Sequence, residues 1–348
     1  MPGILIIAPN WIGDAVMTQP LLAKLQSQFP NSTIDVLASS WVAPIYRACA
    51  QVNEVIEAQF THRQLQWALR KQLAKDLQAK QYQFCFVLPN SFKSALIPWL
   101  ANIPLRIGYR GELRYGLINL ALDNPSKTNR PPMAQHYLAL ADVVANMAND
   151  DPSRPTDFTQ QPQLQIQANA QKRVEQKLQD KKIDPATTYV LCPGAEYGPT
   201  KRWPTEHFAA LTNAILDQDA NHNVILLGGP GDKALANQII RLSEKSDRLH
   251  DWCGTCSLDE SIALIGLCKA VVSNDSGLMH IAAALKTPQV AIFGSSDPKH
   301  TPPLSDKAKV IWLHLPCSPC HQRECPLGHL NCLKEIDPQQ VLATLNTL

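Results

Sequence analysis

Short apolar runs recur along the chain, with amphipathic stretches between them. Runs typical of β-strands lie at Ile4–Ala8, Ile34–Ala38, Cys85–Leu88, Tyr189–Cys192, Val224–Leu227, Ala270–Ser273 and Val290–Phe293. Helical patterns occupy Leu21–Phe29, Gln64–Leu77, Phe208–Leu216, Lys233–Leu242 and Ile262–Leu267. The strand runs are apolar throughout, which is typical of parallel strands buried on both faces. This βαβα order predicts α/β domains with doubly wound sheets.

The length and one polar segment predict two domains. The 348 residues exceed one core of ordinary size, at about 150 residues per domain. A Pro- and Gln-rich segment from Asn149 to Gln167 is typical of a linker. We therefore predict a first domain over residues 1–160, a second over 168–335 and a final helix within 336–348. Open α/β sheets bind ligands beyond the carboxyl ends of their strands, so two such domains facing each other would form a cleft for both substrates.

Composition narrows the class of partner. A net charge of +2, with 18% charged residues, gives no electrostatic reason to expect nucleic acid. The first apolar run has no basic residues before it and is short, and no run approaches the roughly 20 residues of a membrane span. We therefore expect a soluble, cytoplasmic protein. Its ten cysteines are then interpreted as reduced thiols or metal ligands.

The most informative motif is the strand-to-helix turn within residues 271–285. A helix that begins directly after a buried strand leaves backbone N–H groups free to bind phosphate, with the helix dipole adding about half a positive charge. We expect the Ser276 hydroxyl and the N–H groups of Gly277 and Leu278 to contact a diphosphate. Asp275 would repel an anion, so we expect it to turn back and brace the loop. His280 is either a further ligand contact or a buried histidine.

Two more loops follow strands of the second half. Thr200 and Lys201 are placed to contact phosphate, although Lys201 could equally be a solvated loop charge. Asp232 follows a glycine-rich bend and could accept hydrogen bonds from a ribose. Capping of the next helix explains Asp232 about as well.

In the first half, Asp14 follows the first strand where a helix begins. It is either the N-cap of that helix or a general base that accepts a proton from an attacking hydroxyl. The surrounding residues match neither a GxGxxG motif nor a P-loop, which disfavours NAD binding and ATP-dependent phosphoryl transfer.

A local basic patch is also predicted in the first half. Asn90 and Lys93 follow a strand, and Arg106, Arg110 and Arg114 lie within nine residues of one another. Guanidinium groups bind carboxylate and phosphate bidentately, so Asn90, Lys93, Arg110 and Arg114 are candidate contacts for an acidic acceptor. A solvated charged face is the alternative.

The tail carries a cysteine cluster. Its Cys-x2-Cys-x4-Cys-x6-Cys spacing is compatible with a structural zinc ion, and the alternatives are reduced thiols or a redox-sensitive disulfide. The cysteines are Cys317, Cys320, Cys325 and Cys332, with His321 or His329 as alternative ligands. Such a site would brace a loop and take no part in catalysis.

The ordered set of motifs resembles a known family. The segments are 10–14 (NWIGD), 88–96 (LPNSFKSAL), 108–112 (GYRGE), 193–198 (PGAEYG), 201–204 (KRWP) and 274–280 (NDSGLMH). Together they resemble the ADP-heptose:lipopolysaccharide heptosyltransferases, and the heptosyltransferase II type most of all. The resemblance spans nearly the whole chain.

This resemblance implies a GT-B glycosyltransferase fold and an inverting transfer of heptose from ADP-heptose to the first heptose of a lipid-linked lipopolysaccharide inner core. It implies that Asp14 is the base and that Lys201 and the Asp275-Ser276-Gly277 turn bind the diphosphate. The ribose-binding acidic residue of the family falls near Gly231-Asp232, which makes Asp232 the candidate. No cofactor is required for the chemistry. The final helix often crosses back onto the first domain in this fold, and the lipid-linked acceptor implies loose contact with the cytoplasmic membrane face.

Three alternatives to this function stay open at this point. The first is heptosyltransferase I or a later core heptosyltransferase. The second is a sugar-nucleotide 2-epimerase, against which the predicted basic acceptor patch argues. The third is a nucleotide- or metal-binding interaction module organised around the cysteine cluster.

Overall fold

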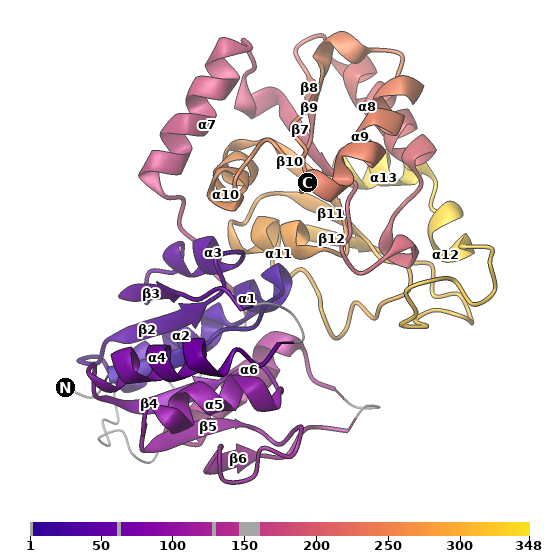
Figure 1. Ribbon diagram of the computed structural model, residues 1–348. Coiled ribbons are helices and arrows are strands. Elements are labelled where there is room, and N and C mark those ends of the chain that lie inside the picture. The colour runs from indigo at the N-terminus through magenta and orange to yellow at the C-terminus, as the bar shows by residue number, and fades with distance from the viewer. Residues whose placement is uncertain (1–2, 61–63, 127–129, 146–160) are drawn as a thin grey trace. The chain divides into compact units, whose positions relative to one another are not determined.

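The computed structural model describes residues 3–60, 64–126, 130–145 and 161–348. The chain divides into two compact units, Met1–Gln163 and Leu164–Leu348 (Figure 1). This division falls between the predicted domains 1–160 and 168–335. Most of the predicted linker, together with the boundary at residue 160, lies outside the described residues.

The first unit is a parallel sheet with helices on its faces. Its elements are β1 (Gly3–Ile7), α1 (Ile12–Met17), α2 (Gln19–Gln28), β2 (Ile34–Ala38), α3 (Ala43–Arg47), β3 (Glu54–Glu57), α4 (Trp67–Gln78), β4 (Tyr82–Val87), α5 (Phe92–Leu100), β5 (Leu105–Tyr109), β6 (Leu120–Leu122) and α6 (Met133–Asp142). The strand order is β3-β2-β1-β4-β5-β6, and the strands pair in parallel.

The central strand β1 shows why the sheet is covered on both sides. Every residue of β1 is buried, and successive side chains of a strand point to opposite faces. Leu5 and Ile7 join the core that includes Ala74 and Leu77 of α4 and Ala95 of α5. Ile4 and Ile6 face the opposite side, and α2 and α6 pack against each other in this unit.

The second unit repeats the arrangement. Its elements are α7 (Ala168–Asp180), β7 (Thr188–Cys192), α8 (Thr205–Gln218), β8 (Asn223–Leu226), α9 (Lys233–Leu242), β9 (Leu249–Asp251), α10 (Leu258–Leu267), β10 (Ala270–Asn274), α11 (Gly277–Ala284), β11 (Gln289–Ile292), β12 (Ala308–Ile311), α12 (Asn331–Lys334) and α13 (Pro338–Leu345). The strand order is β12-β11-β10-β7-β8-β9, again parallel.

Helix α13 contributes to the core of the second unit. The expectation that the helix within 336–348 crosses back to the first domain stays a prediction. In the structure α13 packs on α8 and β11 of the second unit. The reason is that Val341 and Leu345 are buried in the core of this unit, together with Phe208 of α8.

The strand order places the functional candidates. In each sheet the order in which strands are added reverses beside the first strand of the unit. This point lies between β1 and β4 in the first unit and between β7 and β10 in the second. Ligands of open α/β sheets bind beyond the carboxyl ends of the strands at such a point. The segments that follow β1, β4, β7 and β10 are therefore the ones to inspect. Among the helices that the structure describes, none combines the length and apolar composition of a membrane span.

Candidate active site

The end of β10 is tied to the segments that follow β7. Asn274 is fully buried, and its side-chain Oδ1 accepts a hydrogen bond from the Trp203 backbone N–H at 3.0 Å. Its Nδ2 donates to the carbonyl of Pro193 at 2.8 Å. The amide of Asn274 thus fixes two loops at the carboxyl edge of the sheet. This role of Asn274 was not predicted from the sequence, although a buried strand that ends in Asn is a detectable signal.

Asp275 is a buried brace, as the sequence analysis expected. Only 5% of the residue is exposed, and its Oδ2 lies 2.5 Å from Lys201 Nζ. The Ser296 hydroxyl donates to the same oxygen. A buried carboxylate needs such partners, because burial without them costs several kcal/mol. Ser296 follows β11 and was not predicted, although the small polar run Gly294-Ser295-Ser296 after a buried strand could have indicated it.

Lys201 is therefore not a solvated loop charge. Its side chain is 18% exposed and paired with Asp275, and Nζ also lies 5.2 Å from the centroid of the Tyr197 ring. The ammonium group is held close to the turn that begins α11. A fixed cation beside a helix N-terminus suits an anionic ligand.

The first turn of α11 presents the phosphate-type arrangement that the sequence predicted. Ser276 is the N-cap in extended conformation, and its hydroxyl lies 3.1 Å from that of Ser273. Ser276, Gly277 and Leu278 are partly exposed, whereas the next residues of the helix are buried. The first N–H groups of a helix have no partner within the helix. They can therefore meet an anion here.

His280 lies on the buried side of the same helix. It is 5% exposed, and burial lowers the pKa of its imidazole to about 4, with smaller and opposing effects from Asp275 and Lys201. The ring is therefore neutral at pH 7. Of the two expectations for His280, the structure favours the buried histidine.

Thr200 differs from the expectation that it contacts phosphate. The residue is buried, and its hydroxyl donates to the carbonyl of Gln322 at 2.5 Å. The Ser295 hydroxyl in turn donates to Thr200 Oγ1 at 3.1 Å. The Thr200 hydroxyl thus contacts the loop that carries the cysteine cluster, and its side chain acts as a brace between loops.

Asp232 caps the glycine-rich bend after β8. Its Oδ2 accepts the N–H of Gly229 at 2.9 Å. A Cβ at Gly194 would lie 2.3 Å from the carboxylate, and one at Gly228 would lie 2.6 Å from it. The carboxylate therefore lies against the backbone of Gly194 and Gly228, where there is no room for a side chain. Asp232 is the N-cap residue of α9, but its side chain makes no capping hydrogen bond to that helix. The contact of Asp232 with a ribose stays a prediction.

Asp14 lies in the first turn of α1 and is not its N-cap. The N-cap is Trp11, without a side-chain hydrogen bond. Asp14 is partly buried, and its charge affects the pKa of two buried tyrosines, Tyr137 and Tyr46. Burial, with Asp14 as the second cause, raises the pKa of the Tyr137 hydroxyl, and Asp14 has a smaller effect of the same sign on Tyr46. The carboxylate thus lies at the carboxyl edge of the first sheet, near a helix N-terminus that favours its charged form.

Arg114 braces loops and is not a surface contact for an acceptor. It is 3% exposed, and its guanidinium donates to the carbonyls of Pro89 at 2.6 Å and Tyr109 at 2.5 Å. Nη2 also donates to Asn90 Oδ1 at 3.1 Å. Arg106 likewise donates to backbone carbonyls. Burial lowers the pKa of both guanidinium groups.

Arg110, Asn90 and Lys93 remain at the surface or close to it. Arg110 is exposed and pairs with Asp123 at 2.9 Å. Asn90 is exposed, and Lys93 is partly exposed at the start of α5. The nearby loop also carries two exposed apolar side chains, Leu113 at 82% and Tyr115 at 81%. Sequence reasoning missed these two, because exposure of single apolar residues has no pattern.

The cysteine-rich loop belongs to the second unit. Its four cysteines are unpaired, and Cys332 is buried. The Leu330 N–H lowers the pKa of the Cys325 thiol; burial opposes this effect, and the N–H groups of Leu327, Gly328 and His329 reinforce it. Across the described ranges, no three His, Cys, Asp or Glu side chains are grouped so that they could hold a metal ion.

The comparisons with known proteins cover the whole chain. The model of glycosyltransferase family 9 (heptosyltransferase) matches residues 70–331. Lipopolysaccharide heptosyltransferase 2 of Escherichia coli K12 is 40% identical over 353 residues, 99% of this chain and 98% of that protein. Lipooligosaccharide heptosyltransferase 2 of Haemophilus ducreyi is also 40% identical, over 99% of both chains.

A solved structure agrees. ADP-heptose lipopolysaccharide heptosyltransferase II of E. coli superposes with a TM-score of 0.84 at 38% identity, covering 100% of this chain and 98% of that one. This confirms the predicted fold class, two Rossmann-like α/β domains of the GT-B type. The alternatives of an epimerase and of a metal-binding interaction module are not favoured. The chain belongs to glycosyltransferase family 9, the heptosyltransferases.

Proposed function

We propose that this chain is an inverting glycosyltransferase that moves L-glycero-D-manno-heptose from ADP-heptose to the first heptose of the lipopolysaccharide inner core. The observation that carries the proposal is the 40% identity, over nearly the full length of both chains, with proteins named heptosyltransferase 2. Relatives named heptosyltransferase 3 are only 24% identical over 86% of this chain. This difference favours addition of the second heptose over a later one.

The donor diphosphate would bind at the first turn of α11. Ser276, Gly277 and Leu278 present the N–H groups, and Lys201 supplies the positive charge. These groups would stabilise the charge that develops on ADP as it leaves. We therefore propose that the transfer itself needs no metal ion or other cofactor.

Asp14 would act as the general base. The acceptor hydroxyl oxygen attacks the anomeric carbon of the heptose, and its proton passes to the Asp14 carboxylate. The bond between the anomeric carbon and the ADP oxygen breaks in the same step, and its electron pair leaves with ADP. A single displacement of this kind inverts the configuration at the anomeric carbon. Partial burial of Asp14 beside a helix N-terminus keeps a charged carboxylate in a defined place.

The acceptor specificity can be tested directly. Purified protein is incubated with ADP-heptose and inner-core acceptors that carry zero, one or two heptoses, and the products are weighed by mass spectrometry. Transfer to the acceptor with one heptose supports the proposal. Transfer only to the acceptor without heptose would make the enzyme a heptosyltransferase I, and transfer only to the acceptor with two heptoses would make it a later enzyme. Conversion of the nucleotide sugar without any acceptor would indicate an epimerase.

We further propose that the first unit contacts the cytoplasmic face of the membrane that carries the acceptor. The exposed Leu113 and Tyr115, beside the exposed Arg110, support this proposal, because apolar side chains flanked by a basic residue suit an anionic lipid surface. Co-sedimentation with vesicles that contain anionic lipid should weaken in the Leu113→Ser/Tyr115→Ser variant. Leu242→Ser, which removes an exposed leucine of α9, is the control. Equal loss in both would contradict the proposed surface.

A further inference from the structure

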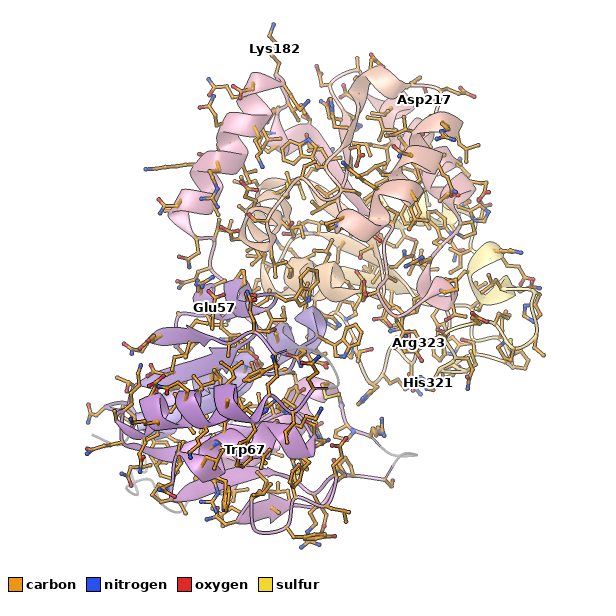
Figure 2. The ribbon with its side chains drawn as sticks, viewed as in Figure 1. Glu57, Trp67, Lys182, Asp217, His321 and Arg323 are labelled. Atoms are coloured by element: carbon orange, nitrogen blue, oxygen red, sulfur yellow. The ribbon has the colours of Figure 1, made fainter. Side chains whose placement is uncertain are left out.

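Two cationic side chains of the second unit contact one aromatic ring. Lys201 Nζ lies 5.2 Å from the centroid of the Tyr197 ring, and Arg323 Cζ lies 5.5 Å from the same centroid. Arg323, which Figure 2 labels, belongs to the loop between β12 and α12, far from Lys201 in the sequence. Both distances lie within the roughly 6 Å over which an aromatic face attracts a cation. The ring thus brings together two positive charges from separate loops.

The two cations differ in their partners. Lys201 is paired with Asp275 at 2.5 Å, and its side chain is 18% exposed. Arg323 is exposed, and its guanidinium forms no ion pair with any residue that the structure describes. The charge of Arg323 is therefore available to a ligand, whereas that of Lys201 is offset by a carboxylate.

The backbone of Arg323 is held against the loop that follows β7. The Thr200 hydroxyl donates to the Arg323 carbonyl at 3.2 Å, and the Tyr197 hydroxyl donates to the carbonyl of His321 at 2.7 Å. Gly198 has φ +149, and a Cβ there would lie 2.8 Å from the Arg323 carbonyl, so the two loops touch at a position that needs glycine. These contacts fix the backbone from which the guanidinium extends and leave the side chain free to turn.

A diphosphate needs more positive charge than the first turn of α11 and Lys201 supply. A sugar-linked diphosphate carries a negative charge on each phosphate. The first N–H groups of α11 contribute about half a positive charge, and Asp275 offsets the charge of Lys201. These groups can accommodate one phosphate, but the second has no full positive charge opposite it.

We propose that Arg323 binds the second phosphate of the donor, the one that carries the sugar. Arginine suits this role because its planar fork donates two parallel hydrogen bonds to phosphate oxygens. An exposed arginine on a free loop would be only a solvated charge, and the fixed backbone and the shared Tyr197 ring distinguish Arg323 from that case. The inference rests on the proposed function, because it assumes that the donor diphosphate binds at the first turn of α11.

Nucleotide affinity tests the inference without any transfer reaction. The full-length protein and its variants are titrated with ADP and with AMP in a calorimeter. Arg323→Gln should weaken ADP binding about tenfold or more, as expected for loss of a hydrogen-bonded charge pair, and AMP binding less than about threefold. Arg323→Lys keeps the charge but not the fork, so its loss should be smaller. Arg241→Gln, which changes an exposed arginine of α9, is the control and should bind both nucleotides as the wild-type protein does.

A second variant tests the placement of Arg323. Thr200→Val keeps the shape of the side chain and removes the hydroxyl that donates to the Arg323 carbonyl. It should weaken ADP binding by itself and add little in the Arg323→Gln background, because both changes act on the same contact. Additive losses would overturn the placement, and the proposal with it.

Chemical labelling of the wild-type protein covers the case in which a variant folds poorly. Phenylglyoxal reacts with accessible guanidinium groups, and mass spectrometry of peptides locates the label. ADP should protect Arg323 from labelling, AMP should protect it less, and neither should protect Arg241.

The contrary results separate this inference from the proposed function. Unchanged ADP affinity of Arg323→Gln, or no protection of Arg323 by ADP, would overturn the inference while wild-type binding of ADP leaves the proposed function standing. Equal losses for ADP and AMP would overturn the assignment to the second phosphate. Unchanged ADP affinity with a raised KM for the acceptor would mean that Arg323 contacts the acceptor instead. Wild-type protein that does not bind ADP would overturn the proposed function, and the inference with it.

Discussion

Replacing Lys201 with methionine isolates the contribution of the Lys201–Asp275 pair. Methionine keeps the length of the side chain and removes its charge. Asp275 then stays 5% exposed with a hydrogen bond from Ser296 but without the cation at 2.5 Å. Breaking a fully buried ion pair from one side costs about 3–5 kcal/mol, because an uncompensated charge remains.

The expected cost is smaller here, since the Lys201 side chain is 18% exposed and water screens part of the interaction. We expect Lys201→Met to lower the free energy of unfolding of the second unit by about 2–3 kcal/mol. With a urea m-value of about 2 kcal/mol/M, the midpoint should fall by about 1–1.5 M. Asp275→Asn should cost less, because the ammonium of Lys201 can reach water. The double variant should be more stable than the sum of the two losses predicts, by about 1–2 kcal/mol.

The assay is urea unfolding, monitored by hydrogen exchange and mass spectrometry. Only peptides from β10 and α11 are analysed, so that the first unit does not contribute. ADP is then added to each variant. In the wild-type protein a ligand of the native state should raise the midpoint, and Lys201→Met should lose most of that increase. Additive losses in the double variant would refute the coupling. A wild-type response to ADP in Lys201→Met would refute the role of Lys201 in donor binding.

Three further predictions concern single residues. Asp14→Asn should reduce kcat at least ~10²-fold and leave ADP binding nearly intact, since the amide cannot accept the proton. The pKa of His280 is about 4 in the folded protein, below its unfolded value of about 6.5, so the contribution of His280 to the free energy of unfolding is fully present above pH 6.5. It should fall by up to ~2 kcal/mol by pH 5, and His280→Gln should not show this loss. Gly194→Ala should weaken ADP binding and destabilise the second unit, because its Cβ would lie 2.3 Å from Asp232, whereas Gly231→Ala has open space and is the control.

Each of these has a contrary result. Normal turnover of the Asp14 variant in the heptose transfer assay would remove the base. A wild-type urea midpoint that does not change between pH 7.5 and pH 5 relative to the His280 variant would mean that the imidazole is not buried as described. Equal stability and ADP affinity of the two glycine variants would show that Asp232 can move away from the strand ends.

The sequence predicted the central strands well and the edge strands poorly. Every residue of β1 and of β10 is buried, so burial on both faces of the sheet accounts for the apolar runs that predicted these strands. By contrast, β3 reads Glu54-Val55-Ile56-Glu57 and lies at the edge of its sheet, partly exposed, where no apolar run is required. β5 was not predicted because it contains Arg106 and Gly108, and neither residue type is typical of a buried strand. There Arg106 donates to loop carbonyls, and a Cβ at Gly108 would approach the Val87 carbonyl at 2.9 Å.

The site residues divide in the same way. Asp275 was predicted as a brace, because an exposed carboxylate would repel a diphosphate, and this electrostatic reason holds without coordinates. The positions of Thr200 and Arg114 could not be predicted, because each is fixed by carbonyl groups distant in sequence, those of Gln322 and Pro89. A hydroxyl or guanidinium in a loop has the same sequence pattern whether it faces a ligand or the backbone of another loop.

The neutral Lys201–Asp275 pair has a consequence for the proposed reaction. The ammonium is in place before the donor arrives, so little side-chain entropy is lost on binding. Because the pair carries no net charge, the attraction for a diphosphate depends largely on the N–H groups at the first turn of α11 and on how far Lys201 shifts its contact from Asp275 to the phosphate. As negative charge grows on the departing ADP, that shift becomes more favourable. The pair would thus stabilise the transition state more than the bound substrate, which is the condition for a contribution to kcat.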